Sequence, residues 1–143
     1  MTRLKISGRG AQSLALARRE RLWLHVDGAY GAAGLAAPSV RHLFAGIDQA
    51  DSLIVDPHKW FFAPYDCAAL LYRDPEQARR AHTQRAGYLE AVTDTGEWNP
   101  FQYAHHLSRR ARGLPFWFSL ATYGTDAYTN AVRATVTVAA RAG

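Results

Sequence analysis

The residue in this sequence with the clearest chemical potential is Lys59, in the segment DPHKW at residues 56–60. The segment follows a short apolar run at residues 52–55, which predicts that Lys59 stands on a turn at the C-terminal end of a strand. Partial burial there would lower the pKa of the amine, and a neutral amine is the nucleophile for a Schiff base. We therefore expect Lys59 to hold a carbonyl cofactor. The alternative is an ordinary lysine whose stem packs past Trp60.

A second stretch, LWLHVDGAYG at residues 22–31, repeats the pattern of an apolar strand that ends in a charged residue. Its Asp27 lies 32 positions before Lys59, which suits one strand–helix–strand crossover and places both side chains at one edge of a parallel sheet. A buried carboxylate hydrogen-bonded to the ring nitrogen of a pyridine cofactor keeps that nitrogen protonated. Ala29 is small enough for such a ring to lie against the backbone.

The elements that must position these residues follow from hydrophobic periodicity and from turn residues. Strands are predicted at residues 22–26, 52–55 and 67–72, the last an apolar run of the kind that is buried on both faces. Helices are predicted at residues 12–21, 40–44, 74–85, 105–122 and 125–141, with Gly124 between the last two and Pro115 as a candidate kink. We expect a loose tail at residues 1–10, a flexible small-residue segment at 28–34 and a mobile loop at 86–101.

Length and composition indicate one domain, because 143 residues with 48% hydrophobic content can form a core. We expect no membrane span, since the sequence has no apolar run of about 18 residues, and no signal peptide follows the basic N-terminus. Cys67 is the only cysteine, which excludes an internal disulfide and fits a reducing compartment. A cytoplasmic location is therefore expected, with Cys67 as a core residue.

The net charge of +5 could indicate an anionic partner. The arginines are scattered, however, and no aromatic-interleaved basic stripe or zinc-finger spacing accompanies them. We therefore expect neither a nucleic-acid partner nor a metal. Only Lys5 and Lys59 are lysines, which makes Lys59 more conspicuous.

The segments HVDGAYG at residues 25–31, Asp51-Ser52 and DPHKW at 56–60 together resemble the pyridoxal-phosphate-dependent group II decarboxylases, which act on aromatic amino acids, histidine or glutamate. The resemblance implies an α/β fold, part of the large domain of the fold-type I transferase-like scaffold, with parallel strands and flanking helices. Residues 22–143 would be a fragment of the domain that binds pyridoxal phosphate. Residues 1–21, a tail and a leading helix, match the family poorly.

The resemblance also assigns roles to single residues. Lys59 resembles the lysine that binds the cofactor covalently, Asp27 the partner of the pyridine nitrogen, and Ala29 the small residue against the ring. His58 resembles the histidine beside the cofactor, although it could simply order the turn. Tyr88 resembles the loop tyrosine that supports protonation after carbon dioxide leaves, although a surface tyrosine is the alternative.

Two further parts of the sequence receive structural roles. Arg109, Arg110 and Arg112 resemble a family segment, for which we expect structural support first and a carboxylate contact second. Trp60 is expected to pack rather than to take part in chemistry.

The implied activity is decarboxylation of an L-amino acid, aromatic or related, to the amine and carbon dioxide. The resemblance also implies a homodimer, and it implies that the phosphate-binding segment and a small C-terminal domain lie outside this chain. We therefore expect the isolated chain to be poorly stable or to self-associate, with weak or no activity. The alternatives are another lyase or aminotransferase on the same scaffold, or a non-catalytic remnant that acts as a structural or interaction module.

Overall fold

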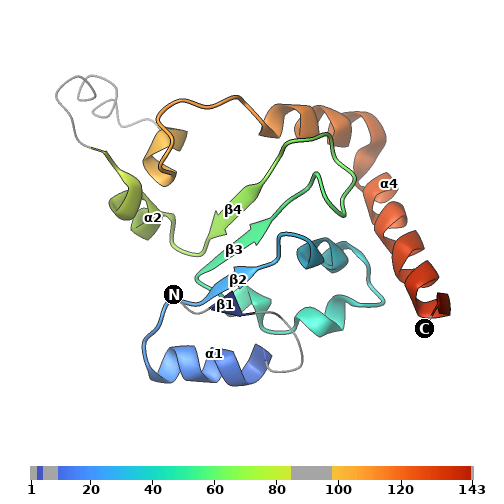
Figure 1. Ribbon diagram of the computed structural model, residues 1–143, viewed down its shortest axis with the longest axis horizontal. Helices are drawn as coiled ribbons and strands as arrows, with labels where there is room; N and C mark the ends of the chain where they lie inside the picture. The colour runs from blue at the N-terminus through green and yellow to red at the C-terminus, as the bar shows by residue number, and fades with distance from the viewer. Residues whose placement is uncertain (1–2, 5–9, 85–97, 143) are drawn as a thin grey trace. The chain divides into compact units, whose positions relative to one another are not determined.

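The computed structural model describes residues 3–4, 10–84 and 98–142 (Figure 1). The chain divides into two compact units, which are described separately below. The first consists of Met1–Leu71 and Ala111–Gly143, and the second of Tyr72–Arg110. Tyr88, predicted to act from a loop, lies outside the described residues. Within the described part of the chain, no helix combines the length and apolar character needed to cross a bilayer.

A four-stranded sheet in the order β1-β2-β3-β4 places the candidate residues. Its strands are β1 (Arg3–Leu4), β2 (His25–Asp27), β3 (Ser52–Val55) and β4 (Ala69–Tyr72). The first three are parallel, with Val26 opposite Leu53 and Asp27 opposite Ile54. The prediction for residues 52–55 is confirmed, and the strand predicted at 22–26 forms later, ending on Asp27. The prediction of a loose tail is wrong at Arg3–Leu4, because these residues pair with β2.

The fourth strand differs from its prediction in direction and burial. In Figure 1 the arrow of β4 runs opposite to that of β3, so the sheet is mixed and the expectation of parallel strands holds only for β1–β3. Leu70 and Leu71 are 47% and 50% exposed. Because consecutive strand residues point to opposite faces, the described residues leave both faces of β4 partly uncovered there. The prediction of burial on both faces is therefore wrong, because no described element packs closely over these two side chains.

Helix α1 (Gly10–Arg19) covers one side of the sheet, as its apolar face predicts. Ala17 is buried together with Leu24, Val26 and Ala50, and Leu14 packs against this cluster. Arg18 and Arg19 lie in the last turn, where cations interact favourably with the helix dipole.

Three short 3₁₀ helices make the crossover from β2 to β3: η1 (Gly31–Ala36), η2 (Arg41–Phe44) and η3 (Ile47–Gln49). The prediction of a flexible segment at residues 28–34 is wrong, because η1 is ordered and its Ala32, Ala33 and Gly34 are buried. Gly34 leaves room for the ring of Phe44, whose Cζ would lie 2.9 Å from an added Cβ. Small residues here permit close packing within the protein.

Gly28 provides a test of this packing. A Cβ at this position would lie 2.7 Å from the Cβ of Ala32 and 3.0 Å from the backbone oxygen of Ile54, and neither atom can move without shifting the backbone. We expect Gly28→Ala to lower the free energy of unfolding by about 1–3 kcal/mol, the usual effect of overpacking. The measurement is urea denaturation.

The matched control is Gly31→Ala. Among the described residues, no heavy atom lies within 4 Å of a Cβ added at Gly31. The control should therefore leave stability within about 0.5 kcal/mol, as for most surface substitutions. Equal effects of the two substitutions would contradict the packing role of Gly28.

Helix α4 (Gly113–Ala142) packs against η1 in the first unit. It contains the predicted break at Gly124, which has φ 75° and ψ 164°, and the hydroxyls of Ser119 and Tyr128 hydrogen-bond across that break. The predicted start at residue 105 is wrong, because the helix begins at Gly113. Pro115 therefore lies in the first turn, where its missing N–H breaks no intrahelical hydrogen bond.

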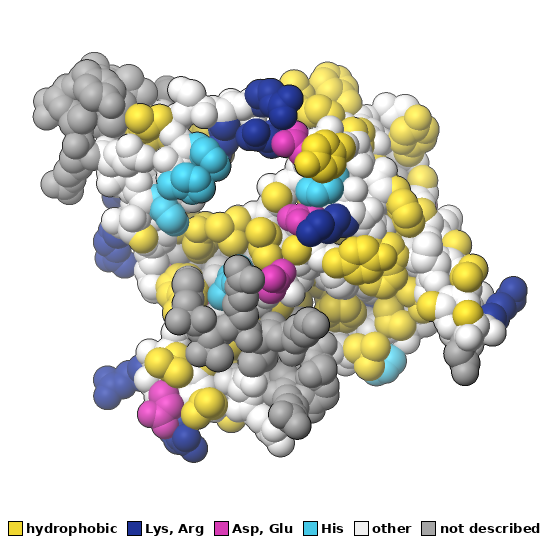
Figure 2. Space-filling model, in the orientation of Figure 1, with side chains coloured by type: hydrophobic (Ala, Val, Ile, Leu, Met, Phe, Trp, Pro, Cys, Tyr) yellow, Lys and Arg dark blue, Asp and Glu magenta, His cyan; other side chains and the backbone are white. Residues whose placement is uncertain are grey.

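Val132 is the buried residue of α4 among those described, and much of the rest of the helix is apolar and exposed. Val132 is fully buried with Ala33 and Ala37 of the η1 region. Figure 2 shows apolar side chains reaching the surface over α4. The exposed large residues of this helix are Leu114, Trp117, Phe118, Tyr123 and Val138. An apolar surface of this kind is typical of an interface, and it agrees with the expectation that the isolated chain self-associates.

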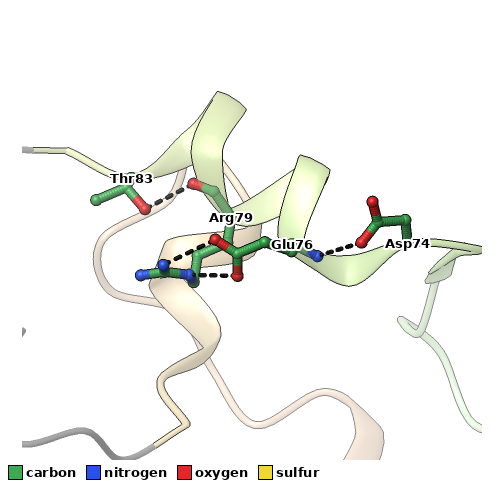
Figure 3. Close-up of polar contacts among 4 residues, drawn as sticks. All are labelled: Asp74, Glu76, Arg79 and Thr83. Atoms are coloured by element: carbon green, nitrogen blue, oxygen red, sulfur yellow. Dashed lines mark hydrogen bonds and ion pairs between the residues drawn. The ribbon is translucent and has the colours of Figure 1, made fainter.

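The second unit contains α2 (Pro75–His82) and η5 (Pro100–Tyr103). Figure 3 shows how α2 begins and ends: the carboxylate of Asp74 accepts from the backbone N–H of Glu76, and the Thr83 hydroxyl donates to the backbone oxygen of Arg79. Arg79 and Glu76 form a two-bond ion pair at 2.8 Å. The helix predicted at residues 74–85 is confirmed, with an earlier end.

Candidate active site

The turn that carries Lys59 is held by backbone hydrogen bonds. The Lys59 N–H donates to the Asp56 oxygen at 2.9 Å, and the Ala63 N–H donates to the Pro57 oxygen at 3.0 Å. The Asp56 N–H donates at 3.0 Å to the oxygen of Ala29, in the turn after β2. The turns after β2 and β3 are thus joined directly. As predicted, Asp27 and Lys59 lie at the same edge of the sheet.

Lys59 forms an ion pair with Asp56, with 2.7 Å between Nζ and Oδ2. The hydrogen bond that Nζ donates to the Asp56 carboxylate is the main cause that raises the pKa of Lys59 above its ordinary value, and the charges of Asp56 and Asp27 raise it further. Burial acts in the opposite direction, but the side chain is 42% exposed. The predicted lowering of the Lys59 pKa is therefore wrong in this structure, because a carboxylate contact outweighs weak desolvation.

Asp56 is the residue at this site that the sequence prediction missed. Its side chain is only 11% exposed, and its buried Oδ1 has no hydrogen-bond partner within the part of the chain that the structure describes. The spacing of three residues in DPHK is the signal that could have identified it, because on a tight turn this spacing brings an acid and a base together.

Asp27 and Ala29 lie next to each other at the end of β2. Asp27 is exposed, and its Oδ1 accepts from the N–H of Ala29 at 3.2 Å. The expectation of a buried carboxylate is therefore wrong for this structure, because Asp27 is the last residue of its strand. An exposed carboxylate at this position is accessible to a cationic group.

His58 is held by the backbone of the loop that leads to β4. Its Nδ1 lies 2.6 Å from the Cys67 oxygen and 3.1 Å from the Cys67 nitrogen, and the tautomer decides which of the two it bonds. The ring also packs edge-on against Tyr65, with 4.9 Å between the centroids. These contacts favour the role of ordering the turn. A role of His58 at the cofactor stays a prediction.

Trp60 connects the turn to α4, in agreement with its expected packing role. Its Nε1–H donates to the Thr135 hydroxyl at 2.7 Å, and that hydroxyl donates to the Val132 oxygen at 2.8 Å. The indole also stacks on Tyr30, with 5.4 Å between the centroids. The position of the turn therefore depends on α4.

Of the three candidate arginines, Arg112 makes the carboxylate contact. Its Nε donates to Oδ2 of Asp66 at 2.9 Å. Arg109, in the second unit, donates to the backbone oxygen of Pro100 at 2.9 Å. Both contacts are structural. Cys67 is buried, as expected, and burial is the main cause that raises the pKa of its thiol.

Comparison with known proteins identifies the family of this chain. Residues 12–142 match the family described as "Pyridoxal-dependent decarboxylase conserved domain", and the chain belongs to that family. It is 36% identical over 119 residues to an aromatic-L-amino-acid decarboxylase of Bacillus atrophaeus, covering 82% of this chain and 25% of the relative. It is 35% identical over 131 residues to tyrosine/DOPA decarboxylase 2 of Papaver somniferum, covering 87% and 24%.

Solved structures give the same result for the fold. The Oryza sativa structure titled "TDC with PLP and tryptamine" matches with a TM-score of 0.74 at 29% identity, covering 82% of this chain and 24% of that one. Rhodiola rosea 4-hydroxyphenylacetaldehyde synthase matches with a TM-score of 0.75 at 29% identity, covering 90% and 25%. The fold-type I scaffold and the resemblance to decarboxylases are thus confirmed, and pyridoxal phosphate is confirmed as the cofactor of the family. The chain spans about a quarter of the length of these proteins.

The residues at the sheet edge fit pyridoxal phosphate. The cofactor has an aldehyde that a primary amine can bind and a ring nitrogen that a carboxylate can keep protonated. Lys59 and Asp27 supply these two groups, and both are exposed. Ala29 adds only a methyl group beside them. Within the described residues no cluster of histidine, cysteine and acidic side chains could hold a metal ion.

Proposed function

We propose that this chain is part of the large domain of a pyridoxal-phosphate-dependent decarboxylase that acts on an aromatic or related L-amino acid. The observation that carries the proposal is the placement of Lys59 and Asp27 on adjoining turns at one edge of the sheet, joined by the bond from the Asp56 N–H to the Ala29 oxygen. The names of the relatives support the aromatic substrate class.

Each residue would have a distinct task. Pyridoxal phosphate, when bound, supplies an electron sink for the electron pair left when the bond from Cα to the carboxylate breaks. Lys59 would bond covalently to the aldehyde carbon and would be displaced by the substrate amine. Asp27 would keep a proton on the ring nitrogen, which makes the ring a better sink. A proton then replaces carbon dioxide on Cα, and the amine is released.

Several finer assignments belong to the same proposal. His58 would stand beside the cofactor, and Tyr88 would support protonation of Cα. Residues 22–143 would form the cofactor-binding fragment, with residues 1–21 leading into it. The intact enzyme would be a homodimer in the cytoplasm; a single cysteine supports the reducing compartment.

A second candidate is formation of an aldehyde instead of an amine. It is favoured by the similarity to 4-hydroxyphenylacetaldehyde synthase of Rhodiola rosea, which is 32% identical over 126 residues. Analysis of the products distinguishes the two, because an amine and carbon dioxide indicate simple decarboxylation and an aldehyde indicates the second reaction.

The proposed function is tested by incubating the purified chain with pyridoxal phosphate and aromatic L-amino acids while carbon dioxide is measured. Release that depends on the amino acid supports the proposal. Because much of the family's length lies outside this chain, the same assay should include a form extended by its flanking coding sequence. An extended form that binds the cofactor and releases no carbon dioxide from any amino acid would overturn the proposal.

A further inference from the structure

Asp56 contacts Lys59 in a way that the nucleophilic role of Lys59 does not require. The 2.7 Å contact between Nζ and Oδ2 pairs the amine with a carboxylate of its own turn. The backbone of Asp56 is held in place, because its N–H donates to the backbone oxygen of Ala29 and its backbone oxygen accepts from the N–H of Lys59. Its carboxylate is also the more buried of the two charged groups, so Lys59 is the partner that is freer to move.

The two residues depend on each other unequally. Lys59 is 42% exposed, so water can solvate its ammonium when the contact breaks. Asp56 is 11% exposed; among the described residues its Oδ1 has no hydrogen-bond partner, and its Oδ2 pairs with the ammonium of Lys59. Removing one partner of a buried charge pair leaves the other uncompensated. Any reaction that removes the positive charge of Lys59 therefore leaves the largely buried Asp56 carboxylate without this charge partner.

The surroundings of the amine act in the same direction. Two carboxylates stabilise the ammonium, Asp56 by hydrogen bond and charge, and Asp27 by charge. The neighbouring His58 directs its Nδ1 to the backbone of Cys67. Arg112 forms an ion pair with Asp66, in the loop that follows this turn.

We propose that Asp56 is a positioning residue that holds Lys59 as an ammonium on its turn and so restrains its reaction with carbonyl compounds until a ligand displaces the contact. Attack on a carbonyl carbon uses the lone pair of Nζ, so the ammonium must first lose one proton to solvent. The identity of the ligand as pyridoxal phosphate rests on the proposed function. The restraint itself does not.

The test is competitive acylation of the protein with trace acetic anhydride across a range of pH, with each acetylated lysine quantified by mass spectrometry. The neutral amine attacks the anhydride and acetate leaves, so the reactivity of each lysine follows its own titration. Lys5, the only other lysine, is an internal reference. In the unaltered chain the midpoint of Lys59 should lie above that of Lys5.

In Asp56→Asn the midpoint of Lys59 should fall, and at a fixed pH below both midpoints its neutral fraction should rise about tenfold for each unit of pKa lost, so its reactivity relative to Lys5 should rise. The matched control is Asp27→Asn, which removes the same charge without removing the hydrogen bond. It should change the Lys59 midpoint less.

Equal shifts of the Lys59 midpoint in the two variants would overturn the proposal, because they would mean that Asp56 acts on Lys59 only through its charge and not through the hydrogen bond. A Lys59 midpoint at or below that of Lys5 in the unaltered chain would also overturn it, and that result is available even if the variant does not fold. Neither result depends on cofactor binding, so failure of the proposed function is seen separately, as an absence of pyridoxal phosphate capture.

Discussion

Replacement of Lys59 by arginine is expected to abolish covalent capture of pyridoxal phosphate, reducing the adduct from about one per chain to none. Arginine keeps the positive charge and can keep a hydrogen bond to Asp56, but its guanidinium stays protonated and has no lone pair for a carbonyl carbon. The measurement is the absorbance of the bound cofactor together with the mass of the chain after borohydride reduction.

Lys5→Arg is the matched control for this substitution, because it removes the only other lysine and should leave the adduct intact. A full adduct on the Lys59→Arg chain would place the covalent link elsewhere. That result would contradict the assignment of Lys59 as the residue that binds the cofactor covalently beside Asp27.

Replacement of Asp27 by asparagine is expected to have the second largest effect. A carboxylate within about 4–6 Å shifts the pKa of a cation by about 1–3 units, so its loss should reduce the ratio of protonated to neutral ring nitrogen at a fixed pH roughly 10- to 1000-fold. The measurement is the ¹⁵N chemical shift of the ring nitrogen in labelled pyridoxal phosphate, recorded against pH. The midpoint should move to lower pH in the variant.

The control for this second prediction is Asp48→Asn, which removes an exposed carboxylate from η3. Its midpoint should match that of the unaltered chain. An unchanged midpoint in Asp27→Asn would mean that another group protonates the ring, and that the position of Asp27 on the sheet edge has no electronic role.

The parts of the fold that could be predicted are those with a local cause. Residues 52–55 form a strand because an apolar run is bounded by polar residues, and Gly124 breaks α4 because glycine tolerates the left-handed region. The direction of β4 could not be predicted, because hydrophobic periodicity is the same for either direction. The start of α4 was predicted too early because the residues from His105 onward are of helix-forming types, and the sequence does not show which groups they contact. In the structure the backbone oxygen of His105 accepts a hydrogen bond from the side chain of Gln84.

The candidate site shows the same division. The shared edge for Asp27 and Lys59 followed from two strand ends and one crossover, and the structure confirms it. The predicted direction of the Lys59 pKa shift is wrong, because the sequence shows which residues are neighbours along the chain but not how exposed they are. Half-exposure weakens desolvation, and the turn brings Asp56 within 2.7 Å. Local geometry therefore decided the sign of the pKa shift.

The central claim is that Lys59 is the covalent anchor for pyridoxal phosphate. Its most direct test is to treat the unaltered chain with pyridoxal phosphate and borohydride, digest it, and map the reduced adduct by mass spectrometry. We predict a single modified peptide that contains Lys59, with Lys5 unmodified under the same conditions. An adduct shared equally between the two lysines, or no adduct at all, would contradict the claim and favour a non-catalytic remnant of the family.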